Sequence, residues 1–110
     1  SQCTENHPQN AMQSLYKEAK VYEKLYQQNK KIIFRDKAIL KYREALKRKL
    51  RYAQDRYYFA KASYDLGQTY LRLKRYNSAQ AVYKNLAAKN FPGTQDAKEI
   101  AEHIQKRYLN

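Results

Sequence analysis

The chain has 110 residues and carries 23 Lys and Arg against 10 Asp and Glu, a formal net charge of +13. Apolar residues make up 43% of the chain, which predicts one small folded domain rather than a disordered chain. No apolar run approaches the roughly 20 residues of a membrane-spanning helix. The lone cysteine, Cys3, excludes an internal disulfide, and His7 and His103 lie far apart. We therefore expect no metal site and no cofactor.

The first elements are a tether and two helices. Residues 1–10 are polar and lack a helical period, which predicts a flexible N-terminal tether, and residues 11–110 form the predicted helical domain. Apolar residues spaced three and four apart predict a first helix over residues 11–33. A second stripe, ending at Ala53, predicts a helix that begins after Arg35 and Asp36, with Asp36 as its cap or in its first turn.

Three further helices complete the predicted domain. A third stripe runs from Phe59 to Leu73, and its boundary with the second is placed near residues 52–56. Residues 74–78 combine cations with a polar cap, which predicts a break before a fourth helix that ends at residues 90–93. Thr94 is the predicted cap of a final helix through Tyr108. Five helices with short loops predict an all-α, antiparallel array.

One segment, residues 62–93, carries a specific spacing of small and aromatic residues. The order is L-G-x-x-Y, then A-x-x-x-Y, then Pro, and it resembles a tetratricopeptide repeat; the residues are Leu66, Gly67, Tyr70, Tyr76, Ala79, Tyr83 and Pro92. Small residues at Gly67 and Ala79 would let the paired helices approach closely, with Tyr70 and Tyr83 between their turns.

Two other segments are similar to parts of neighbouring repeats. Ala38 and Tyr42 match Ala79 and Tyr83, 41 residues later, which implies an earlier repeat with longer helices. Residues 100 and 101 follow the Leu-Gly pair by 34 residues and imply a terminal capping helix. The resemblance therefore implies a helix-turn-helix array of about two repeats plus a C-terminal capping helix.

The resemblance also implies a partner-binding groove, because the first helix of each tetratricopeptide repeat lines the inner surface. The corresponding positions are mostly polar or basic: Lys20, Glu23, Gln27, Lys30, Lys31, Lys61, Tyr64, Gln68 and Arg72.

A second candidate surface follows from the charge distribution. Residues 28–75 carry 15 basic and four acidic residues, a net charge of +11. Along the predicted second helix they form a basic patch: Lys37, Lys41, Arg43, Lys47, Arg48 and Arg51. An acidic protein surface, anionic lipid or nucleic acid could each bind such a patch.

Nine of the 12 tyrosines fall into two sets. Core stripes hold Tyr22, Tyr42, Tyr70 and Tyr83, and the candidates for exposure are Tyr16, Tyr52, Tyr57, Tyr58 and Tyr64. Exposed aromatics among cations can stack bases, but core packing and protein contacts explain them better, so a nucleic-acid partner is disfavoured.

The C-terminal junction and the cysteine suggest a location. Residues 91–98 are similar to a junction in bacterial envelope proteins of this family, the tetratricopeptide lipoprotein of the barrel-assembly machinery and the Tol-Pal coordinator. Cys3 resembles the lipid-acceptor cysteine of a bacterial lipoprotein; a free thiol is the alternative. Such a protein would be anchored by lipid at the periplasmic side of the outer membrane.

The acidic residues provide no catalytic pair. Asp36, Asp55 and Asp65 are separated and surrounded by cations, so we expect no enzyme activity. His103 lies beside the last apolar stripe as a boundary residue. Three hypotheses remain: an envelope scaffold that binds a partner protein, a cytoplasmic adaptor that binds an acidic segment, and a non-specific nucleic-acid binder.

Overall fold

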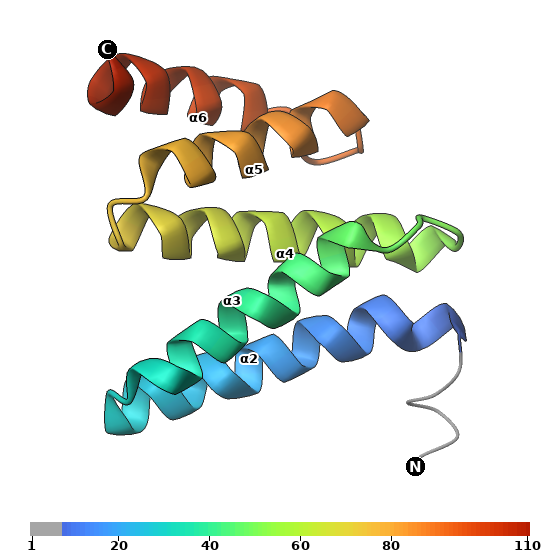
Figure 1. Ribbon diagram of the computed structural model, residues 1–110. Helices are drawn as coiled ribbons and strands as arrows, with labels where there is room; N and C mark the ends of the chain where they lie inside the picture. The colour runs from blue at the N-terminus through green and yellow to red at the C-terminus, as the bar shows by residue number, and fades with distance from the viewer. Residues whose placement is uncertain (1–7) are drawn as a thin grey trace. The chain divides into compact units, whose positions relative to one another are not determined.

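The computed structural model describes residues 8–110, and this part of the chain contains helices and no strand (Figure 1). The α-helices are α2 (Ala11–Asn29), α3 (Ile32–Lys47), α4 (Ala53–Arg72), α5 (Tyr76–Lys89) and α6 (Ala97–Ile104). A short 3-10 turn, η1 (Pro8–Asn10), precedes them, and a π-helical turn, η2 (Gln105–Leu109), follows them. The predicted all-α class and helix-turn-helix packing are confirmed.

The chain forms two compact units that divide between Ala62 and Ser63, inside α4. The first unit contains η1, α2, α3 and the N-terminal half of α4. The second contains the remainder of α4 with α5, α6 and η2.

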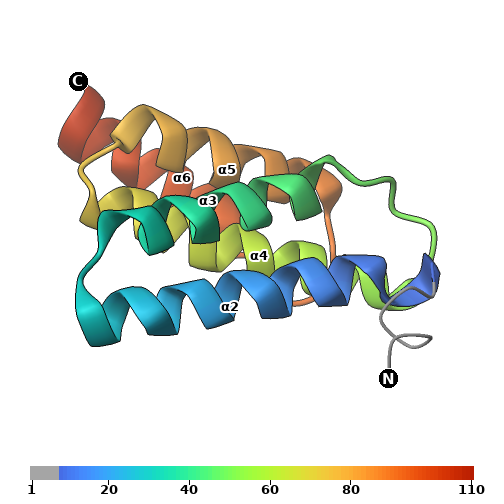
Figure 2. The ribbon, with the colours of Figure 1, turned by 60° about the horizontal axis from the view of Figure 1, so that its bottom comes forward.

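In the first unit, α2 and α3 run side by side in opposite directions (Figure 2). The predicted first helix over residues 11–33 is too long, because Lys30 takes the left-handed conformation (φ 61°) and ends α2. The Asn29 side chain then accepts the backbone N–H of Lys31 at 2.9 Å. Ile32 and Ile33 consequently begin α3 and are both more than half exposed.

The start of α3 also corrects the role given to Asp36. This carboxylate lies in the second turn of α3, where it pairs with the Arg35 guanidinium at 3.1 Å, rather than at the helix cap. The N-cap residue is Lys31, whose side chain forms no capping hydrogen bond.

The core of the first unit is built around one tyrosine. The ring of Tyr16 on α2 lies 6.0 Å from that of Tyr42 on α3 and 5.8 Å from that of Tyr58 on α4. Ala19, fully buried, lies one turn further along α2. The prediction that Tyr16 is exposed is wrong, since the residue is only 9% exposed.

The N-terminal segment is more ordered than predicted at its end. The Gln54 side-chain amide donates to the Gln9 carbonyl and, at 3.0 Å, to the Asn10 side chain, so Pro8–Asn10 form part of the folded unit. The remainder of the predicted tether, including Cys3, lies outside the described residues.

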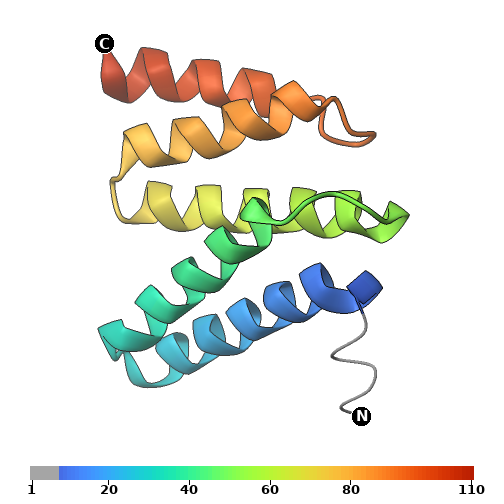
Figure 3. The ribbon, with the colours of Figure 1, turned by 45° about the vertical axis from the view of Figure 1, so that its right-hand side comes forward.

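In the second unit, α5 and α6 pack against each other (Figure 3). A Cβ atom added at Gly67 of α4 would lie 2.5 Å from the ring of Tyr83 on α5, and this tyrosine is fully buried. The predicted close approach at Gly67 is therefore confirmed.

The turns of this unit partly match the sequence prediction. The break near residues 74–78 is present, but α5 begins at Tyr76, after Lys74 in the left-handed conformation. Thr94 is buried, and its hydroxyl donates to the Phe91 carbonyl at 2.8 Å. The final helix begins three residues after Thr94, with Asp96 at the N-cap position, so Thr94 is not its cap.

Candidate functional site

The most basic part of the first unit is the connection between α3 and α4, residues 48–52. Helix α3 ends at Lys47 because Arg48 adopts an extended conformation (φ −74°, ψ 150°). At its C-terminal end the connection is held by Asp55, which lies in the first turn of α4. One oxygen of this carboxylate accepts the backbone N–H groups of Arg51 and Tyr52, both at 2.9 Å, which is the acidic half of a capping box.

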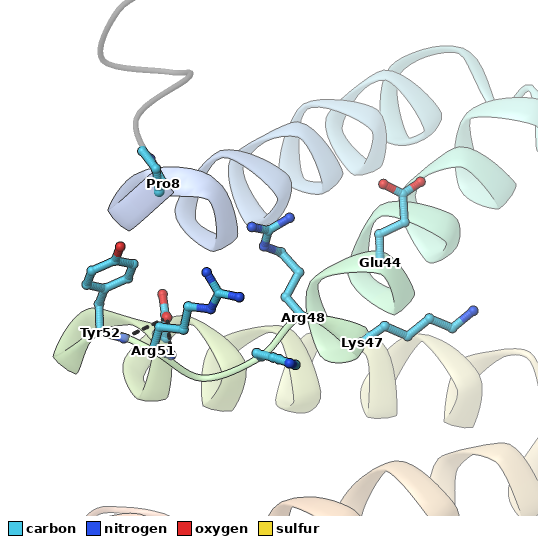
Figure 4. A pocket seen from close by; sticks show the side chains of 8 residues that line it. Pro8, Glu44, Lys47, Arg48, Arg51 and Tyr52 are labelled. Atoms are coloured by element: carbon cyan, nitrogen blue, oxygen red, sulfur yellow. Dashed lines mark hydrogen bonds between the residues drawn. The ribbon is translucent and has the colours of Figure 1, made fainter.

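These residues surround a hollow of about 350 Å³, which we call the basic hollow. Its lining consists of Pro8, Glu44, Lys47, Arg48, Lys49, Arg51, Tyr52 and Asp55. Figure 4 shows the Arg48 and Arg51 side chains reaching from the connection into the space between Pro8 and Glu44. The volume lies at the lower end of the range for small-ligand sites.

The charge of the basic hollow is not balanced internally. The lining holds two acids against four cations. Asp55 is 4% exposed and accepts backbone N–H groups, and Glu44 has a 3.9 Å contact with Lys41, which does not line the hollow. Within residues 8–110, no ion pair joins a carboxylate to the four lining cations, Lys47, Arg48, Lys49 and Arg51. The hollow therefore has a net positive charge that an external anion can neutralise.

The structure divides the predicted basic patch. The patch was expected along one helix, but α3 holds only its first four residues, because Arg48 caps that helix and Arg51 lies beyond it. Of the helical members, Lys41 pairs with Glu18 at 3.1 Å, and this hydrogen bond raises the pKa of Lys41 despite partial desolvation. Lys37 lies over the Tyr22 ring, 5.6 Å from its centroid. The remaining two, Arg43 and Lys47, are exposed.

The groove residues of the first unit lie in two places. Lys20 on α2 and Lys61 on α4 converge on the Tyr16 ring, at 6.0 and 5.6 Å from its centroid. Lys20 also pairs with Glu23 at 3.1 Å, and the Tyr42 hydroxyl donates to the same carboxylate. These contacts give both lysines a packing role.

The remaining first-unit groove residues extend away from this cluster. Gln27 is exposed on α2, whereas Lys30 and Lys31 form the turn between α2 and α3. Lys30 lies over the Tyr26 ring at 5.8 Å. The two turn lysines are thus not on the face of the first helix, where the repeat pattern had placed them.

The groove residues of the second unit are engaged by neighbours. The Tyr64 hydroxyl donates to Asp96, and the Gln68 amide donates to the Tyr83 hydroxyl at 3.2 Å. Arg72 donates to the Thr69 hydroxyl at 3.2 Å.

Two tyrosine hydroxyls in this cluster have perturbed pKa values. Burial, followed by the hydrogen bond to Asp96, raises the pKa of Tyr64. Burial also raises the pKa of Tyr83, against the opposing hydrogen bond from Gln68. Both side chains are therefore held in their neutral form.

The other tyrosines named from the sequence, and His103, differ in how exposed their side chains are. Tyr52 and Tyr57 are 39% and 59% exposed, as predicted, while Tyr58 is half-buried. Tyr22, predicted for the core, is also half-buried and stacks on Phe34. His103 is exposed on α6.

Residues 8–110 contain neither a metal-ligand cluster nor a membrane-spanning helix. In that range, no group of three or more His, Cys, Asp or Glu side chains could hold a metal ion. Over the same residues, no helix has the length and apolar character needed to cross a membrane. The candidate lipidation residue, Cys3, lies outside this range.

Sequence reasoning identified Arg48, Arg51 and Tyr52 separately but missed their assembly with Lys49 and Pro8. The available signal was the uninterrupted basic run at residues 47–49, followed by another Arg two residues later. Periodic apolar residues on both sides of this run concealed the end of α3.

Comparisons of the chain with protein-family models, with curated proteins and with solved structures find no match. The resemblance to tetratricopeptide repeats therefore stays a prediction from the residues that carry it.

Proposed function

We propose that this chain is a helical interaction module that binds an acidic segment of a partner protein. The observation that supports the proposal is the basic hollow, whose four cations have no carboxylate partner among residues 8–110. The excess charge is concentrated in the first unit, where residues 1–62 hold 15 basic and six acidic residues, against eight and four in residues 63–110.

Charge and aromatic contacts would contribute at different stages of binding. A strongly basic surface attracts an acidic partner and accelerates association, whereas a well-packed Arg or aromatic anchor slows dissociation. The exposed rings of Tyr52 and Tyr57 lie in the same unit as the four cations of the basic hollow and can supply such an anchor.

Binding of a fluorescein-labelled peptide of alternating Glu and Ser, measured by anisotropy, tests this proposal. We expect saturable binding of this peptide and none of the matched peptide with Gln in place of Glu. A labelled single-stranded oligonucleotide is compared at about 50 and 200 mM salt, because phosphate attraction weakens steeply over this range. Oligonucleotide binding that persists at the higher salt while the acidic peptide fails to bind would favour the nucleic-acid hypothesis instead.

A location at the periplasmic face of the bacterial outer membrane is part of the same proposal. It is supported by the resemblance of the C-terminal junction to envelope tetratricopeptide proteins and by Cys3, which lies just before the polar segment predicted as a tether. Stable anchoring takes two membrane signals, so a lipid on Cys3 would act together with a second acyl chain or a basic patch. Intact-mass measurement of the protein from its native cells should show a lipid adduct that Cys3→Ser removes; an unmodified thiol and recovery in the cytoplasmic fraction would support the adaptor hypothesis.

A further inference from the structure

We propose that the acidic segment binds in the basic hollow, with Arg48 and Arg51 holding its carboxylates and Tyr52 packing beside them. This inference rests on the proposed function and adds the location and chemistry of the binding site. It also moves binding away from the groove that the repeat resemblance implies.

The geometry of the basic hollow supports a clamp for carboxylates. Both guanidinium groups extend from one short connection into the same space, between Pro8 and Glu44 (Figure 4). A guanidinium presents parallel N–H donors that match the two oxygens of a carboxylate, so two neighbouring arginines can hold two acidic side chains.

The connection that carries the clamp is held in place before any partner binds. The Asp55 carboxylate fixes the backbone of Arg51 and Tyr52 through two hydrogen bonds of 2.9 Å. A backbone ordered in advance reduces the entropy lost on binding. The side chain of Tyr52 remains 39% exposed and can cover an aliphatic stem of the bound segment.

Within the first unit, the cations of the predicted groove are less available to an acidic segment than those of the basic hollow. The groove cations Lys20 and Lys61 both lie over the Tyr16 ring, and Lys20 also pairs with Glu23. An incoming carboxylate would have to compete with these contacts. In the basic hollow neither lining acid, Asp55 or Glu44, forms an ion pair with a lining cation among residues 8–110, which leaves the cations to the partner.

The size of the hollow favours an extended segment over a folded surface. A volume of about 350 Å³ accommodates a few side chains but is too small to enclose a helix, whose diameter with side chains is roughly 10 Å. Adjacent acidic residues of an extended peptide alternate in direction, so those two apart could enter together.

Paired variants test the location of the site. Arg48→Gln with Arg51→Gln removes two positive charges from the hollow; Arg43→Gln with Arg56→Gln removes the same charge from exposed positions of the first unit that do not line it. We expect the first pair to weaken binding of the Glu-Ser peptide at least about tenfold, and the control pair by less than about threefold. Circular dichroism and thermal melts establish that both variants fold.

A conservative variant separates charge from geometry. Arg48→Lys with Arg51→Lys keeps both charges but replaces planar forks with point charges. We expect an affinity between those of the wild type and the glutamine pair. Recovery of the full wild-type affinity would overturn the proposed arginine clamp.

Amide chemical-shift changes of the wild-type chain during peptide titration give a second readout that needs no variant. We expect the largest changes at residues 47–52. Equal weakening by the two glutamine pairs, or shifts centred on Lys20 and Lys61, would overturn the location while leaving the proposed function in place. Absence of peptide binding by the wild type would reject both.

Discussion

The two units bury a tyrosine between helices in opposite ways. In the first, Tyr16 is surrounded by other large groups: the rings of Tyr42 and Tyr58 and the ammonium groups of Lys20 and Lys61. In the second, the Tyr83 ring lies directly against the backbone of Gly67. One contact requires a large side chain at its centre, and the other requires the absence of one.

A second difference accompanies the first: two lysine ammonium groups lie over the Tyr16 ring, whereas the Tyr83 ring packs against the Gly67 backbone. Although Tyr16 is only 9% exposed, the long side chains of Lys20 and Lys61 reach over its ring. Such side chains pack their stems on apolar groups and keep their charges near water. At Gly67 the close approach leaves no space for a long side chain over the Tyr83 ring. The Tyr83 hydroxyl instead accepts a hydrogen bond from the Gln68 amide at 3.2 Å.

Truncation at the centre of the first unit should have the largest effect on stability. Tyr16→Ala removes a ring that is 9% exposed and contacts both Tyr42 and Tyr58, so we expect a loss of about 3 kcal/mol in the free energy of unfolding. Urea denaturation measures the change. Tyr57→Ala, at a ring 59% exposed, is the control and should cost less than about 1 kcal/mol. Similar losses in the two variants would contradict the central role of Tyr16.

Adding a side chain should damage the second unit. The Cβ of Gly67→Ala would lie 2.5 Å from the ring of Tyr83, which is fully buried and cannot withdraw without breaking its contact with Gln68. We expect a loss of about 1–3 kcal/mol, although alanine favours helices. Gly93→Ala is a control for backbone conformation alone. Among the described residues other than its chain neighbours, no atom lies within 4 Å of the added Cβ, so the expected loss of about 1 kcal/mol comes from the positive φ of 81°. A Gly67→Ala variant as stable as the wild type would disprove the close contact.

The packing around Tyr16 and the contact at Gly67 also show which features the sequence could predict. The close approach of the helices at Gly67 followed from the spacing of small and aromatic residues inside helices of regular period, whereas the contact of Gly67 with the Tyr83 ring came from the structure. The burial of Tyr16 was missed because its partners, Tyr42 and Tyr58, are distant in sequence and come from two other helices.

Helix ends without Gly or Pro account for the remaining errors. Lys30 ends α2 in a left-handed conformation, while the apolar residues Ile32 and Ile33 continue the period beyond the turn. Likewise, α3 ends at Lys47 although Leu50 and Ala53 extend the pattern. The candidate cations were identified from charge alone, but the basic hollow exists only because α3 ends at that point.

Removing the carboxylate that fixes this turn should have a smaller effect than either core change. Asp55→Ala frees the backbone N–H groups of Arg51 and Tyr52 and exposes an uncapped helix end, so we expect a loss of about 1–2 kcal/mol. Asp36→Ala is the matched control, since that exposed acid pairs with its sequence neighbour Arg35, and its change should stay within about 0.5 kcal/mol. Equal costs in denaturation experiments would remove the special role of Asp55.

The smallest expected effect is a pH dependence that belongs to the second unit. The raised pKa of Tyr64 means that the folded state keeps the hydroxyl proton at pH values where the unfolded state, with an ordinary tyrosine pKa of about 10, releases it. This contribution is fully present below about pH 10 and is lost as the pH rises toward the folded pKa. Tyr64→Phe should therefore reduce the fall in unfolding free energy between about pH 9 and 11. Asp96→Asn, which removes the acceptor charge, should act in the same direction, and an unchanged fall in both variants would contradict the role given to this hydrogen bond.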